Sequence, residues 1–225
     1  MSSITEAINE LKAKLPAGVQ LIAVSKTHPA DYIREAYEAG LRHFGENKVQ
    51  EMTDKQAQLP QDIRWHMIGH LQTNKVKYIA PYVHLIHSID SPKLLATVDK
   101  EARKAGRVID CLLQVHIAAE DTKFGFAPAE AEEYARSGAI GELTSVRIRG
   151  LMGMASFTDD TARVRAEFAA LKALFDRLGR QCFAGTGCFD TLSMGMSGDY
   201  EEAIAEGSTM VRIGNGIFGK RYYQL

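Results

Sequence analysis

The sequence predicts an α/β chain in which strands and helices alternate, and a closed (β/α)₈ barrel is the architecture that fits it best. Eight short apolar runs recur along the 225 residues, and the first seven are each followed by a segment with helical spacing. No stretch rich in proline, glycine and serine interrupts this series, so we expect a single domain over 1–225. Eight such units in a chain of this length favour a closed barrel, with an open doubly wound sheet as the alternative.

An additional helix is expected before the first strand. Ile4, Ile8, Leu11 and Leu15 recur at helical spacing, and the segment lacks the continuous apolar run of a signal peptide. The chain is therefore expected to open with an amphipathic helix that precedes the repeating units.

The repeating units follow in order, each with a strand and then a helix. The strands are expected at 19–25, 41–45, 63–69, 83–89, 108–118, 145–154, 189–195 and 209–219. The intervening helices are expected at 30–40, 46–59, 71–80, 91–106, 127–138, 158–179 and 198–207. Gly40 and Gly106 are predicted to end their helices, and Ser91 followed by Pro92 is predicted to begin one.

Composition excludes several classes of protein. The formal net charge is −1 with both signs interspersed, so nothing predicts binding to nucleic acid or to anionic lipid. Three cysteines give an odd number that suits a reducing compartment, and no window approaches 18 consecutive apolar residues. We therefore expect a cytoplasmic protein without membrane spans, and a monomer, because a closed barrel needs no partner to complete its sheet.

Lys26 follows the first expected strand in "LIAVSKTHPA". Lysine is among the residues least often buried, so a lysine placed after a core strand either lies in solvent or serves a site. In a (β/α)₈ barrel the carboxyl ends of the strands form the active-site mouth, and Lys26 would lie there.

Small residues lie where the last two expected strands end, in "LSMGMSGD" and "RIGNGIFG". The loops after strands seven and eight of such barrels often bind phosphate through backbone N–H groups, which glycine allows to approach closely. "GNGIFG" also matches the G-x-G-x-x-G pattern, but only six residues follow Gly219, too few for the helix, strand and acidic residue of a dinucleotide site. A phosphate-binding cup is the better interpretation.

A strand-end lysine opposite a phosphate cup suits pyridoxal 5′-phosphate (PLP), whose aldehyde and phosphate lie on different sides of its ring. The same pair of features suits a Schiff-base aldolase that acts on a sugar phosphate. The residues alone leave both open.

Six blocks of sequence resemble the pyridoxal phosphate homeostasis protein family, single-domain relatives of the N-terminal barrel of alanine racemase. The blocks are "AVSKTHP", "FGENKVQE", "WHMIGHLQTNK", "QVHIAAEDTKFGF", "RGLMGMA" and "LSMGMSGDYEEAIAEGSTMVRIGNGIFG". They extend over almost the whole chain. The resemblance implies a modified TIM barrel that binds PLP and stores or delivers it inside the cell, with PLP-dependent apo-enzymes as acceptors, rather than a turnover reaction.

The resemblance also implies roles for individual residues. Lys26 in "VSK" corresponds to the lysine that forms the internal aldimine, and Asn47 in "GEN" to a residue that lines the cofactor site. Arg212 in "VRIG" corresponds to the arginine that faces the pyridine ring. The phosphate cup would consist of Ser193 in "LSMG" with the backbone of Gly214 and Asn215 in "IGNG". Where this chain has Asn215 the family usually has threonine or serine, so a hydroxyl contact would be replaced by an amide.

Arg212 bears on the choice between binding and catalysis. An arginine does not protonate the pyridine nitrogen, so the ring would be a weak electron sink. Racemisation also needs a second acid or base, which alanine racemase takes from a separate domain. We therefore predict a PLP-binding protein that is not an enzyme, with an amino-acid racemase as the alternative.

Histidines offer a metal-binding hypothesis that the spacing does not favour. His66 and His70, or His84 and His87, could form ligand pairs, but no third ligand follows at the spacing of a metal site. The sequence therefore predicts that these rings pack in strands or lie on the surface, and no metal is expected.

Overall fold

A closed barrel of eight parallel strands forms the centre of the computed structural model, which describes residues 3–119 and 124–219. Each strand pairs with its sequence neighbours, and β1 pairs with β8 to close the ring. The strands are β1 (Gln20–Val24), β2 (His43–Glu46), β3 (Arg64–Met67), β4 (Leu85–Ile89), β5 (Ile109–Gln114), β6 (Val146–Met152), β7 (Thr191–Met196) and β8 (Met210–Ile213). The predicted (β/α)₈ barrel is confirmed, and the open sheet is excluded.

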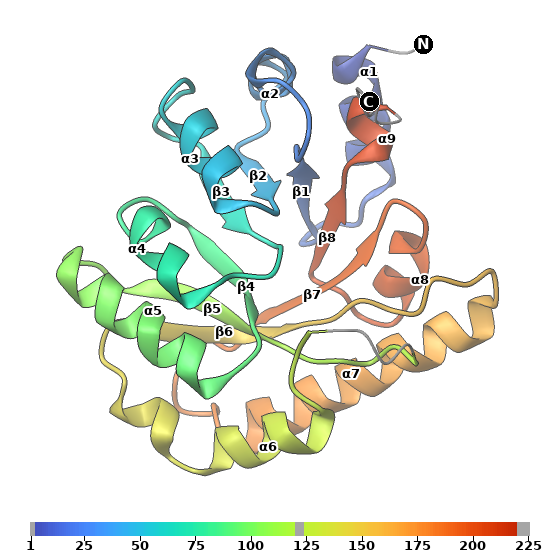
Figure 1. The fold of residues 1–225 in the computed structure, drawn as a ribbon. Helices are drawn as coiled ribbons and strands as arrows, with labels where there is room; N and C mark the ends of the chain where they lie inside the picture. Colours follow the sequence, from blue (N-terminus) through green and yellow to red (C-terminus); the bar gives the residue numbers. More distant parts are fainter. Residues whose placement is uncertain (1–2, 120–123, 220–225) are drawn as a thin grey trace.

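Helices surround the barrel on its outer face (Figure 1). The α-helices are α1 (Ile4–Lys14), α2 (Ala30–Glu38), α3 (Val49–Gln56), α4 (Val76–Ile79), α5 (Pro92–Lys104), α6 (Pro128–Arg136), α7 (Thr161–Gln181), α8 (Tyr200–Ala205) and α9 (Asn215–Phe218). Two 3₁₀ segments, η1 (Thr73–Lys75) and η2 (Ala139–Glu142), complete the described elements. No helix among the described residues is long and apolar enough to cross a bilayer.

The additional N-terminal helix is present and packs beside α2 and α9, so the first and last helices meet (Figure 1). Ser3 caps α1 in a capping box with Glu6, whose carboxylate accepts the Ser3 backbone N–H at 2.8 Å. Ile8 and Leu11 are buried, as their spacing predicts. Ser91 likewise caps α5, with Pro92 in its first turn.

Three elements differ from the sequence-based expectation. Glu46 ends β2 instead of beginning a helix, and α3 starts three residues later. The segment 71–80 divides into η1 and the single turn α4. After Ile213 the last strand gives way to the short helix α9, because the chain turns at Gly214 and Asn215.

Hydrophobic side chains fill two layers. The outer faces of the strands and the inner faces of the helices form one continuous core, with Trp65, Phe44 and Phe168 among its largest buried members. Inside the barrel a smaller cluster contains Ile22, Leu85, Leu112, Met152 and Met210. The remaining space inside the barrel holds polar side chains, which connect its two mouths.

Candidate functional site

A cavity of about 380 Å³ opens at the carboxyl-terminal mouth of the barrel. Loops after β1, β2, β3, β6, β7 and β8 surround it, as expected for a (β/α)₈ barrel. Its volume lies within the range of small-molecule sites. Its lining includes five of the six predicted site residues: Lys26, Asn47, Arg212, Gly214 and Asn215.

Lys26 lies two residues beyond β1 and is half-buried in the cavity wall. The next residue, Thr27, has a positive φ of 68°, a conformation rare for residues other than glycine. Its backbone N–H donates to Glu51 Oε1 at 2.6 Å, and the His28 N–H donates to the Ser25 carbonyl at 3.1 Å. These bonds fix the turn that directs the chain from the strand into the mouth.

A buried ion pair between Lys55 and Glu46 contacts this turn through Ser25. Lys55 Nζ donates to Glu46 Oε1 at 2.7 Å, to Glu51 Oε1 at 2.7 Å and to the Ser25 carbonyl at 2.8 Å. The Ser25 hydroxyl donates to the same Glu46 oxygen at 2.7 Å. Burial raises the pKa of Glu46 to about 7, against the opposing effect of the Lys55 ammonium.

Sequence reasoning missed this network. The sequence predicts that Glu46 begins a helix, and nothing in the sequence distinguishes Lys55 from an exposed lysine on that helix. In the structure Glu46 is the last residue of a buried strand, and Lys55, near the end of α3, contacts its carboxylate.

Arg212 extends from β8 into the base of the cavity and is almost fully buried. Its guanidinium donates to the Ser193 hydroxyl at 2.6 Å and to the Gly153 carbonyl at 3.0 Å. It forms no salt bridge with any described carboxylate, although Asp199 is close enough to act on its charge. Burial lowers the pKa of Arg212 to about 10, so the group stays protonated at neutral pH.

Ser193 does not lie where the phosphate cup was predicted. It is fully buried inside the barrel, where its hydroxyl bonds to Arg212 and to His87 Nδ1 at 2.9 Å, and it is not part of the cavity lining. Ser193 lies within β7, whereas Ser197 directly follows the last residue of that strand and lies in the cavity wall. Ser193 therefore supports Arg212 from within the barrel.

Gly214 and Asn215, which follow β8, also line the cavity. The Gly214 N–H donates to Ser197 Oγ at 3.3 Å, which joins the loops after β7 and β8. A Cβ on Gly214 would lie 3.1 Å from the Val24 carbonyl, so only glycine fits comfortably against β1 here. Asn215 begins α9, and N–H groups in a first helical turn have no partner within the helix.

Asn47 follows β2 and contributes a half-buried side chain to the same wall. Gly69, two residues after β3, allows the Asn47 backbone to pack closely against it, since a Cβ at Gly69 would meet the Asn47 carbonyl oxygen at 2.4 Å. The cavity thus combines an ammonium and a guanidinium with backbone amides and neutral hydroxyl and amide groups. Two carboxylates, Asp159 and Asp199, also line it, and burial raises the pKa of Asp199.

Behind Arg212, a row of imidazoles extends through the barrel to its other mouth. His43 Nδ1 lies 2.9 Å from His66 Nε2, and His66 Nδ1 lies 2.9 Å from His87 Nε2. We call His43, His66 and His87 the histidine column. His87 meets Ser193, so the column connects the amino-terminal mouth to Arg212.

Comparisons with known proteins agree with this architecture. The family model described as the N-terminal domain of alanine racemase matches residues 1–222. A Pseudomonas aeruginosa protein named pyridoxal phosphate homeostasis protein is 40% identical over 99% of this chain and 98% of its own length. An Aquifex aeolicus protein of the same name is 40% identical over 99% of this chain and 97% of its own length.

Solved structures give the same result. PipY of Synechococcus elongatus, in its structure without PLP, superimposes with a TM-score of 0.88 at 42% identity, over 96% of this chain and 100% of PipY. A second structure of PipY, with PLP bound, superimposes with a TM-score of 0.86 at 41% identity over the same shares. Fold and cavity together define a barrel of the alanine racemase N-terminal type. Within that class, this chain belongs to the pyridoxal phosphate homeostasis protein family.

Proposed function

We propose that this chain, folded as a single barrel domain, binds PLP in the cavity at the carboxyl-terminal mouth and serves to store and supply it. The observation that carries the proposal is the meeting of Lys26, Arg212, Gly214 and Asn215 in one cavity of suitable size. The names of the relatives and the PLP-bound structure of PipY support the same ligand.

The chemistry of the donor set fits PLP. The Lys26 amine can condense with the aldehyde, with loss of one water, to form a Schiff base. The backbone amides around Gly214 and Asn215, with the Ser197 hydroxyl, would hold the phosphate in place of the predicted Ser193. Arg212, a buried cation without a described carboxylate partner, would donate a hydrogen bond to the pyridine nitrogen.

The same geometry supports binding over turnover. A guanidinium with a pKa near 10 leaves the pyridine nitrogen unprotonated at neutral pH, so bound PLP would stabilise a carbanion weakly. The described lining contains no tyrosine, histidine or cysteine to act as a second acid or base, and it contains Asp159 and Asp199. A racemase, the alternative function, would require one of these carboxylates to exchange a proton opposite Lys26.

The absorption spectrum of purified protein reconstituted with PLP tests the proposal directly. We expect the visible band of a Schiff base in the unmodified protein and in Lys48→Ala, whose lysine is exposed outside the cavity lining, but not in Lys26→Ala. Borohydride reduction should fix the ligand to the peptide that contains Lys26, as read by mass spectrometry. A protein that stays colourless after reconstitution would refute PLP binding and favour the aldolase.

Two further assays separate supply from catalysis. Reconstituted protein mixed with a PLP-dependent apo-enzyme should restore that enzyme's activity, while chiral analysis of L-alanine should show no interconversion. Racemisation that depends on Lys26 and Asp199 would establish the racemase instead. Size-exclusion chromatography with light scattering should give the mass of a monomer.

A further inference from the structure

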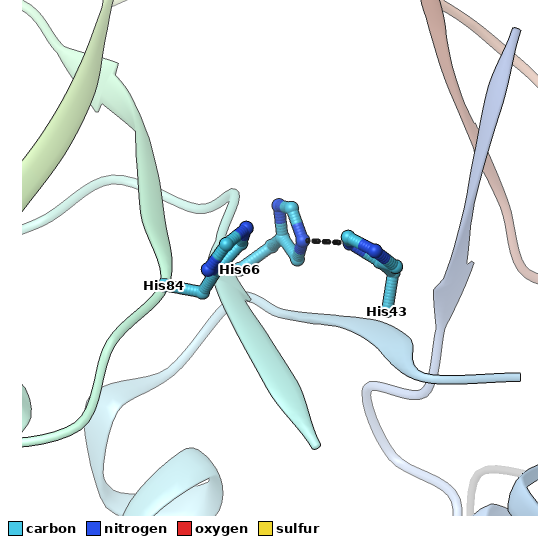
Figure 2. A group of neighbouring side chains, drawn as sticks. All are labelled: His43, His66 and His84. Atoms are coloured by element: carbon cyan, nitrogen blue, oxygen red, sulfur yellow. Dashed lines mark hydrogen bonds between the residues drawn. The ribbon is translucent and has the colours of Figure 1, made fainter. Parts of the chain in front are cut away.

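Three histidines meet at the amino-terminal mouth of the barrel, at the opposite end from the cavity already described. His43 is the first residue of β2, His66 lies in β3, and His84 immediately precedes β4. Figure 2 shows the three rings beside one another, with the bond between His43 and His66 drawn. One ring nitrogen from each residue lies within 4.8 Å of the corresponding atoms of the other two.

The rings are packed against one another, and no carboxylate among the described residues bonds to them. Their centroids are 5.1 Å apart for His43 and His66, 5.3 Å for His66 and His84, and 5.5 Å for His43 and His84. His66 is fully buried, while the other two are half-buried at the mouth. The His84 ring makes no hydrogen bond to any residue that the structure describes, which leaves its nitrogens available.

Counting protons along the hydrogen bonds fixes the state of the rings. Arg64 Nη1 lies 3.3 Å from His43 Nε2, and five hydrogen bonds connect Arg64 to Arg212 through the histidine column and Ser193. Arginine only donates, so both ends supply a proton, and three neutral imidazoles supply the other three. The column is satisfied when each histidine is neutral, and neutral imidazole is the form that binds metal ions.

We propose that His43, His66 and His84 bind a divalent transition-metal ion of borderline softness, with Zn²⁺ as the principal candidate. Three imidazoles and one open position form a recurrent zinc site. With Zn–N bonds of about 2.0–2.1 Å, the ligand nitrogens of a tetrahedral ion lie about 3.4 Å apart. His43 Nδ1 and His66 Nε2 are already 2.9 Å apart, so the ion takes the place of the proton between them.

The space around the three histidines allows the movement of His84 that the ion still requires. His84 must move toward the other two rings by up to about 1.4 Å, a distance that rotation of a half-buried side chain provides. A cavity of about 440 Å³, lined by His43, His84, Arg64 and Asp110, adjoins the cluster and gives an ion and a fourth, water ligand access.

A metal-bound histidine usually makes a hydrogen bond through its other ring nitrogen, and His66 already makes such a bond. Its Nδ1 bonds to His87 Nε2 at 2.9 Å, which orients the ring so that Nε2 faces His43 and His84. Such partners fix the tautomer and orientation of a ligating imidazole. The buried half of the site is therefore preformed.

Arg64 opposes the ion and so provides a specific test. Its guanidinium donates to His43 Nε2, which must carry the displaced proton when Nδ1 binds the metal. Arg149 adds positive charge near this mouth, although it is paired with Asp110 at 3.0 Å and with Asp190 at 2.8 Å. Arg64 is exposed and can swing into solvent, so removing it should strengthen metal binding.

The experiment titrates Zn²⁺ by calorimetry, and Co²⁺ by its visible absorption, into untagged protein carrying Cys182→Ser and Cys188→Ser, which removes the partly exposed thiols as competing ligands. We expect one ion per chain and at least a tenfold loss of affinity in His84→Ala. His70→Ala, which removes an exposed histidine bonded to Asp90 at 3.0 Å, should bind normally.

Arg64→Ala should bind several times more tightly, whereas Arg165→Ala, which removes an exposed arginine on α7, should not. His43→Gln repeats the test of ligand loss if His84→Ala proves unstable by circular dichroism. If His84→Ala and His43→Gln bind the ion as tightly as the cysteine-substituted parent, the proposal is overturned. Weaker binding in Arg64→Ala, or the absence of the Co²⁺ spectrum of a tetrahedral site, would also overturn it.

Discussion

Replacing Lys55 with methionine tests how the turn that carries Lys26 is held in place. The side chain of Lys55 is 7% exposed and that of Glu46 is fully buried, so the variant leaves a carboxyl group in the core without its cation. Three charge-assisted hydrogen bonds from the ammonium are lost, each with a net value of about 1.5 kcal/mol. The sum agrees with the roughly 3–5 kcal/mol lost when one partner of a buried ion pair is removed.

The cost of Lys55→Met should depend on pH in a definite direction. The pKa of Glu46 is about 7 with Lys55 present and rises further without it. Below pH 7 the carboxyl is protonated in both proteins, whereas above pH 7 it ionises only when Lys55 is there. The folded variant then holds more protons than the folded parent, so the cost should grow by up to about 1.4 kcal/mol for each pH unit above 7.

Urea unfolding followed by circular dichroism at pH 6, 7 and 8 measures both effects. Near neutral pH the free energy of unfolding should fall by about 3–5 kcal/mol, and the melting temperature by on the order of 10 °C. Lys104→Met is the matched control, since Lys104 pairs with Glu101 at 2.7 Å on the surface with 59% of its side chain exposed, and it should cost less than about 1 kcal/mol. A cost for Lys55→Met that equals the control, or that does not change with pH, would refute the reasoning.

Two further predictions concern the cavity and the histidine column. Gly69→Ala should displace the Asn47 backbone, which a Cβ would approach to 2.4 Å, and weaken PLP binding in a fluorescence titration by about tenfold or more. Gly141→Ala, where a Cβ meets nothing within 4 Å, should bind normally, and equal affinities would contradict this role of Gly69. Burial lowers the pKa of His43 to about 4 from 6.5, and those of the other rings in the column also fall. The unfolded chain therefore binds more protons at these histidines than the folded chain does between about pH 6.5 and 4, so stability should fall on acidification. The raised pKa of Glu46 has the opposite effect on stability and reduces the fall. The urea midpoint should be lower at pH 5.5 than at pH 7.5 and the fall smaller in His43→Gln; an identical fall in both would show that His43 is not responsible.

Local sequence signals were sufficient for the fold and for the position of Lys26. Apolar runs followed by helical spacing predicted eight strands, and Gly40 and Gly106 do end their helices with positive φ values of 87° and 65°. These signals work because each depends on residues close together in the chain. Five of the residues that the family resemblance assigned to the site line one cavity, because the carboxyl ends of the parallel strands meet at one mouth.

Contacts between distant segments explain what the sequence did not predict. Ser193 was expected in the cavity, but it lies within β7 and is buried inside the barrel, whereas Ser197, which follows the end of β7, lines the cavity. The position at which β7 ends relative to the mouth depends on its pairing with β6 and β8, which the sequence of β7 alone does not show. The histidine pairs considered from spacing were also not the ones that meet, because His43 joins His66 only through the pairing of β2 with β3.

The closure of the barrel has a consequence for when the mouth acquires its function during synthesis. Lys26 follows β1 near the start of the chain, whereas Arg212 and Gly214 belong to β8 and its loop, and the two segments meet only when Ala23 pairs with Ile213. A nascent chain that lacks its last strand therefore has the lysine without the rest of the pocket. Contacts of such long sequence separation form late and slowly. The ligand should accordingly bind only after β8 has been synthesised and has paired with β1, and its binding free energy should protect the pairing of β1 with β8 from local opening, measurable as slower amide hydrogen exchange along those two strands.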